Sequence, residues 1–153
     1  MSIVDSLSGL THRLLSPAHH LALRNAYFSV RKQSAPLLKL VYGTFDARAL
    51  CSHLESRIGA DFDCLMVHSS INKLAPMYRG GPLELVKALL ELVGPERTLA
   101  MPAFYFGDPK IGGLLDTLRA RPELDLRRTP SQVGMATELF RRMPGVLCSR
   151  HPI

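Results

Sequence analysis

The stretch GGPLELVKALLELVGPERTLAMPAF, residues 80–104, decides the fold of this chain. Leucines and valines recur three and four positions apart from Pro82 to residue 93, which predicts an amphipathic helix that the proline opens and a Gly-Pro pair closes. The run TLAMPAF, residues 98–104, then has the length and composition of a strand. A helix that leads directly into a strand is typical of a β-α-β unit, so a first strand should precede residue 80.

The first strand is predicted at the apolar run CLMV, residues 64–67, which begins about 30 residues ahead of TLAMPAF, the length of a β-α-β crossover. This run has the composition of a buried strand. The two strands, at about 63–68 and 97–103, should be parallel and adjacent, because such a crossover joins neighbours of one sheet. Ahead of them, Asp46 has the position of an N-cap for a helix that ends at Gly59. We therefore expect an α/β protein, with a parallel or mixed sheet and flanking helices.

Past residue 104 the local signals are mixed. Residues 105–128 are irregular in pattern, with several glycines and a polar stretch at 115–128 that allows one or two helical turns. The TPS segment, residues 129–131, places a threonine N-cap before a proline at the first helical position, which predicts a helix over about 130–143. Residues 146–148 have the composition of one more strand. Residues 46–153 are thus expected to form the α/β domain.

Residues 1–45 differ from the rest of the chain in charge. They hold five basic residues and one acidic residue, namely Arg13, Arg24, Arg31, Lys32 and Lys39 with Asp5. The segment is too apolar for a free tail, so we expect a basic helical N-terminal arm packed on the rest of the protein or on a second subunit. An organelle transit peptide, or a patch that binds nucleic acid or anionic lipid, would have a similar composition.

Composition places the chain among soluble globular proteins, with 46% hydrophobic and 21% charged residues. No run approaches the roughly 20 apolar residues of a membrane span, and the start lacks the pattern of a signal peptide, so a cytoplasmic location is expected. The three cysteines are far apart and form no CxxC pair, which predicts reduced, mostly buried thiols and no metal site. The isoelectric point of about 9.6 alone does not indicate a nucleic-acid binder, because no basic-aromatic reading motif accompanies it.

Two segments combine polar side chains with a predicted helix start. HSS, residues 68–70, follows the first strand and precedes the helix at Pro82, and RRTPS, residues 127–131, opens the last helix. A helix N-terminus presents unpaired N–H groups and a partial positive charge, so both segments can hold phosphate oxygens. No Walker loop, GxGxxG, HExxH or GxSxG motif is present, which argues against the common nucleotide-binding, zinc-protease and esterase chemistries. His68 fits either a base or a structural hydrogen-bonding residue.

Four motifs occur in order: LMVHSSI, GGP at a helix start, TLAMPAF, and RTPSQVGMATELFRRMPGVLCSRHP. Over about residues 62–153 they resemble the first half of the aminoglycoside 3-N-acetyltransferase family. The resemblance implies an antibiotic-acetyltransferase-like fold, acetyl-CoA as co-substrate, no metal, and transfer of an acetyl group to an amino group of an aminoglycoside or related amino sugar. It also implies that the HSS and TPS segments line the groove for the CoA pantetheine arm and phosphates. The cofactor-binding residues expected on this basis are His68, Ser69, Ser70, Arg128, Thr129 and Ser131.

Members of that family are longer than this chain and continue past the His-Pro pair that ends near residue 153. The resemblance therefore implies that the catalytic base lies beyond residue 153, and that this chain is an incomplete and inactive form of the enzyme. A catalytically empty CoA-binding or assembly module is the alternative, with a homo-oligomer as a further expectation. The acceptor stays open between an antibiotic and a cell-surface sugar. A partner nucleic acid is not expected.

Overall fold

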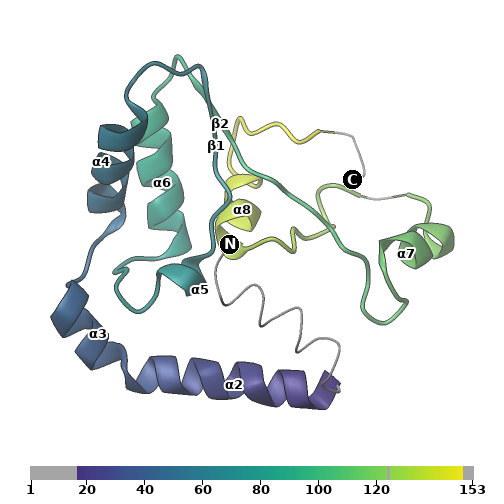
Figure 1. The fold of residues 1–153 in the computed structure, drawn as a ribbon. Coiled ribbons are helices and arrows are strands. Elements are labelled where there is room, and N and C mark those ends of the chain that lie inside the picture. The colour runs from purple at the N-terminus through teal and green to yellow at the C-terminus, as the bar shows by residue number, and fades with distance from the viewer. Residues whose placement is uncertain (1–16, 124, 150–153) are drawn as a thin grey trace. The chain divides into compact units, whose positions relative to one another are not determined.

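The computed structural model describes residues 17–123 and 125–149, and the chain forms two compact units, Met1–Thr44 and Phe45–Ile153. The described part of the first unit consists of helices α2 (Pro17–Gln33) and α3 (Ala35–Tyr42), drawn in purple and blue in Figure 1. Ser34 joins them: its N–H donates to the Val30 carbonyl and its own carbonyl accepts from the Leu38 N–H, both at 2.9 Å. The expected packing of this arm on the rest of the protein stays a prediction.

The second unit holds a parallel pair of strands and the helices around it (Figure 1). Strand β1 (Cys64–Met66) pairs with β2 (Thr98–Ala100) in register from Cys64 opposite Thr98 to Met66 opposite Ala100. The predicted parallel, adjacent strands are thus confirmed, although both are shorter than predicted. In chain order the helices of this unit are α4 (Ala47–Ile58), α5 (Ile71–Leu74), α6 (Pro82–Val93), α7 (Leu114–Ala120) and α8 (Met135–Phe140).

Helix α6 is the centre of the core. It contacts α4, α8 and β2, and Val86, Leu89 and Leu85 retain only 0%, 1% and 2% of their accessible surface. Leu85 and Leu89 belong to one buried cluster, with residues of α4, and Val86 belongs to a second cluster, with Ala136 and Phe140 of α8. One crossover helix therefore supplies both halves of the core of the described unit.

Side-chain hydrogen bonds define the start of α4 and both ends of α6, the two helices with the clearest sequence signals. The Asp46 carboxylate accepts from the Ala49 N–H at 2.8 Å, which confirms the predicted N-cap of α4. At the start of α6, the Gly81 N–H donates to Glu84 Oε2 at 2.7 Å. Past its end, Arg97 donates through Nε to the Val93 carbonyl at 2.7 Å, so a side chain satisfies a carbonyl of the last turn.

The predicted start of the helix over 130–143 is wrong. Helix α8 begins at Met135, with Gly134 as its N-cap, and residues 129–134 form a loop. The reason is tertiary: the Ser131 N–H donates to Glu138 Oε2 at 2.7 Å, and the Gln132 N–H donates to the Phe104 carbonyl at 2.8 Å. These bonds stabilise a loop at the positions where the TPS segment alone would favour a helical turn.

Three further expectations are corrected. Residues 146–148 form no strand, and Val146 instead packs beside the second buried cluster. Strand β1 is not buried on both faces, because Leu65 packs against the core while Met66 is 74% exposed, as alternation along a strand with one covered face requires. Of the cysteines, Cys51 is buried but Cys64 and Cys148 are exposed. None of the helices in the described ranges is long and apolar enough to cross a membrane.

A pair of leucines on α6 tests the central position of this helix. Leu89→Ala should lower the free energy of unfolding by about 2–5 kcal/mol, because it opens a cavity at a fully buried site. Leu83→Ala removes the same atoms from the same helix at a position that is 41% exposed, and should change stability by about 0.5 kcal/mol or less. Urea denaturation followed by circular dichroism measures both. Equal losses for the two variants would contradict the described packing.

Candidate functional site

An open groove of about 1390 Å³ lies at the carboxyl ends of β1 and β2. Met66, the last residue of β1, and His68, just after this strand, line it, and residues 101–105 line it just after β2. The opposite side consists of the loop from Asp125 to Ser131, residues of α8, and residues 146–149. The carboxyl ends of parallel strands are where open α/β proteins bind their ligands, so this groove is the candidate site.

The groove combines apolar walls with a few cationic or polar groups. Met66, Met101 and Phe104 contribute apolar surface on the side of the sheet. His68 and the guanidinium of Arg127 are both exposed and both line the groove. A mostly apolar concave site with few polar groups is typical of sites for organic ligands and cofactors.

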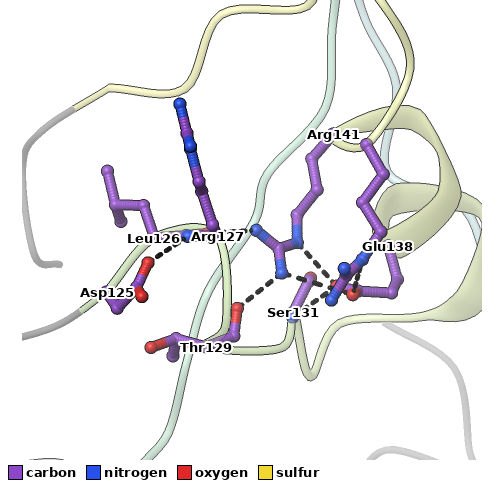
Figure 2. A network of polar contacts seen from close by, with 8 residues as sticks. Asp125, Leu126, Arg127, Thr129, Ser131, Glu138 and Arg141 are labelled. Atoms are coloured by element: carbon purple, nitrogen blue, oxygen red, sulfur yellow. Dashed lines mark hydrogen bonds and ion pairs between the residues drawn. The ribbon is translucent and has the colours of Figure 1, made fainter.

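A buried ion pair on α8 forms the support of the groove. Arg141 Nε donates to Glu138 Oε2 at 2.6 Å, and the two side chains are only 8% and 17% exposed. The same carboxylate oxygen accepts the Ser131 N–H at 2.7 Å, while Arg142 donates to Glu138 Oε1. Figure 2 shows Arg141 and Ser131 beside Glu138. Burial alone would raise the pKa of Glu138, but the hydrogen bonds from Arg141, Ser131 and Arg142 outweigh burial and lower this pKa from 4.5 to about 2.

The guanidinium of Arg141 extends this support to the loop that lines the groove. Its Nη1 donates to the Leu126 carbonyl and its Nη2 donates to the Thr129 carbonyl, both at 2.5 Å (Figure 2). Within the loop, the Asp125 carboxylate accepts the Arg127 N–H at 2.8 Å. The conformation of residues 125–131 is therefore tied to α8 at two carbonyls and, through Glu138, at one N–H.

Gln132 ties the same loop to the segment that follows β2. Its side-chain oxygen accepts the Phe106 N–H at 2.5 Å, and its side-chain nitrogen donates to the Gly107 carbonyl at 3.1 Å. Next to it, Gly134 has a φ of 141°, and a Cβ built at this position would lie 3.5 Å from the Ser69 carbonyl oxygen. The HSS segment thus lies close to Gly134, and His68 of this segment lines the same groove as Thr129 and Ser131 of the TPS segment.

Three of the six residues expected to bind the cofactor line the groove, namely His68, Thr129 and Ser131. His68 is exposed and makes no hydrogen bond to the described residues, whereas Thr129 and Ser131 are half-buried. The Ser131 Oγ is buried and has no hydrogen-bond partner among the described residues. Their participation in cofactor binding stays a prediction.

The other three expected residues, Ser69, Ser70 and Arg128, do not line the groove. Ser69 is half-buried beside Gly134, and its Oγ also lacks a partner in the described part of the chain. Ser70 is exposed at the N-cap of α5, where its carbonyl accepts the Lys73 N–H at 2.9 Å. Arg128 is exposed and pairs with Asp125 at 3.5 Å.

The expectation that the two predicted helix starts hold phosphate oxygens stays a prediction. Glu84 already accepts the N–H at the start of α6, and Glu138 already accepts the Ser131 N–H. A phosphate that bound either of these two N–H groups would have to displace that carboxylate. Arg127 is the better candidate, because its side chain lines the groove, forms no ion pair with the described residues and points away from the Glu138 network in Figure 2.

Sequence reasoning missed Glu138, Arg141 and Gln132. The spacing of Glu138 three and four residues before two arginines is a visible signal for ion pairs on a helix. Nothing in the local sequence indicates that Arg141 also binds loop carbonyls, or that Gln132 joins two loops. Among the described residues no group of three or more metal-ligating side chains is present.

The pH dependence of stability tests the role of Glu138. Its folded pKa lies below the ordinary value, so its stabilisation is fully present above about pH 4.5 and is lost as the pH falls through about 2. Glu138→Gln should cost about 3 kcal/mol at pH 7, and the difference from the wild type should shrink between about pH 4.5 and pH 2. Glu55→Gln, at an exposed position of α4, is the matched control. Denaturant titrations across this pH range measure the free energy of unfolding of both variants. Equal losses for Glu138→Gln and Glu55→Gln would contradict the role of Glu138 in the network.

Comparisons with known proteins agree on one family. The family model for aminoglycoside 3-N-acetyltransferases matches residues 66–153, which include all residues that line the groove. An SPbeta prophage-derived aminoglycoside N(3')-acetyltransferase-like protein of Bacillus subtilis (strain 168) is 33% identical over 100 residues, covering 58% of this chain and 36% of that protein. Aminoglycoside N(3)-acetyltransferase IV of Salmonella sp is 34% identical over 90 residues, covering 58% of this chain and 30% of that protein.

This chain spans about a third of the length of these two relatives. No solved structure matches it. The family match extends over more than half of the chain and contains the strand end after β1, the loop at residues 125–131 and α8, which together build the groove. The chain belongs to the aminoglycoside 3-N-acetyltransferase family.

Proposed function

We propose that the groove binds acetyl-CoA and serves the transfer of its acetyl group to an amino group of an aminoglycoside or related amino sugar. One observation carries the proposal: every residue that lines the groove at the carboxyl ends of β1 and β2 falls within the family match. Use of acetyl-CoA would put this activity in the cytoplasm. No metal is required for the transfer.

The chemistry of the groove suits a CoA thioester. The pantetheine arm is a chain of methylenes and amides, which fits apolar walls such as Met66, Met101 and Phe104. The CoA phosphates are anions, for which Arg127 offers a guanidinium that no described carboxylate neutralises. Each charge-assisted hydrogen bond of this kind contributes about 1.5–3 kcal/mol.

In the proposed reaction the acceptor amine attacks the thioester carbonyl, a C–N bond forms, the C–S bond breaks, and CoA leaves as its thiol. The amine must first lose its proton, and a positioned base contributes about 10²–10⁴ in rate. A base is normally held by a partner on its second nitrogen, but His68 makes no hydrogen bond to the described residues. We therefore propose that His68 contacts the cofactor and does not act as the base.

Two neighbouring arginines test cofactor binding. Arg127→Ala should weaken CoA binding about tenfold to a hundredfold, because it removes the cation that lines the groove. Arg128→Ala should change the affinity little, because Arg128 is exposed, pairs with Asp125 and lies outside the groove lining. Calorimetric titration with CoA measures both. A larger loss for Arg128→Ala would restore the assignment made from sequence, and no binding by the folded wild type would refute the cofactor proposal.

A thiol-release assay with acetyl-CoA and a panel of aminoglycosides and simpler amino sugars tests transfer. The proposed reaction predicts CoA release that depends on an amine-bearing acceptor, whereas the inactive form expected from the sequence predicts none. Binding of CoA without release across the whole panel would favour the alternative of a CoA-binding or assembly module. His68→Ala should weaken acetyl-CoA binding. Loss of turnover in this variant at unchanged CoA affinity would instead make His68 the base.

A further inference from the structure

Helix α3 presents an apolar stripe outward. Leu37, Leu40 and Val41 are three and four positions apart, so they lie on one face of the helix, and they are 62%, 82% and 64% exposed. Leu38, on another face, is half-buried. An outward face that is more apolar than the inward one is unusual for a helix of a globular domain.

Helix α2 carries a second stripe of the same kind. Leu23, Tyr27 and Val30 follow one another at intervals of four and three, and they are 54%, 58% and 63% exposed. Single exposed apolar side chains are ordinary on protein surfaces, but a contiguous set at helical spacing marks an interaction surface. We call these six residues the apolar stripes.

The charge around the apolar stripes has one sign. Between residues 17 and 44 the sequence contains no Asp or Glu, and its basic residues include Lys32 and Lys39, whose side chains are exposed, and the half-buried Arg31. Residues 46–153 carry 14 basic and 12 acidic residues, so neither they nor a second copy of the chain offers this arm a net negative charge. The positive charge of this arm therefore favours an anionic partner.

We propose that α2 and α3 dock on the surface of an anionic lipid bilayer, with the apolar stripes at the boundary between headgroups and acyl chains and the basic side chains on the acidic headgroups. A lipid surface offers apolar contact and negative charge together, as the two features of the arm require. Nucleic acid would use the positive charge but leave the stripes in water. The inference is independent of the proposed function, because it involves no residue of the groove.

The test is co-sedimentation of the full chain with vesicles. Binding is expected to vesicles of phosphatidylserine and phosphatidylcholine, to be far weaker with phosphatidylcholine alone, and to fall as salt is added, because each Lys or Arg near an anionic surface contributes about fivefold in affinity. Equal binding to both kinds of vesicle, or to neither, would refute the proposal.

Matched double variants separate charge from apolar contact. Lys32→Glu with Lys39→Glu, and Leu37→Ser with Leu40→Ser, should each lower vesicle binding by about tenfold or more. Lys87→Glu on α6 and Leu115→Ser on α7 change exposed residues of the second unit and should leave binding unchanged. Circular dichroism and light scattering accompany each variant. If the leucine variant lowered thermal stability, or converted an oligomer to a monomer, the stripes would be covered by protein and the membrane proposal would be wrong.

Discussion

The burial of α6 is the constraint on which the rest of the described unit depends. Val86 faces α8 while Leu85 and Leu89 face α4, and all three are almost fully removed from water. Because side chains on two adjacent faces of one helix fill two clusters, the positions of α4 and α8 are set through the same element. The helix also contacts β2, the second strand at whose carboxyl end the groove opens. The position of the groove is thus a consequence of the packing of a single crossover helix.

The groove itself depends on a different kind of interaction. Glu138 is a carboxylate that is 17% exposed, and removal of a charge from water is unfavourable unless hydrogen bonds replace the lost solvent. Arg141, Arg142 and the Ser131 N–H provide these bonds. Arg141 also donates to two carbonyls of the loop at residues 125–131. The side chain that neutralises the buried carboxylate therefore also fixes the loop that lines the groove.

The elements that could be predicted from sequence are those in which local signals and tertiary packing agree. Helix α6 has a proline at its first position, an apolar stripe and a closing glycine, and its bounds were predicted correctly. The start of α8 was not, because the TPS segment has a good local cap and a well-placed proline, yet the bonds made by Ser131 and Gln132 outweigh it. Propensities of this size, about 1 kcal/mol for an N-cap, are easily exceeded by a buried network.

The same reasoning explains how much of the site the sequence could indicate. The family motifs identified segments that line the groove, but they could not decide between Arg127 and Arg128. In the structure Arg127 lines the groove, whereas Arg128 pairs with Asp125 and lies outside the lining. Glu84 accepts the Gly81 N–H at the start of α6, and Glu138 accepts the Ser131 N–H in the loop ahead of α8. The proposed anionic ligand would then be bound by side chains of a loop that Arg141, Glu138 and Gln132 hold in place. It follows that ligand affinity and the stability of the Glu138–Arg141 pair should change together, although neither residue needs to contact the ligand.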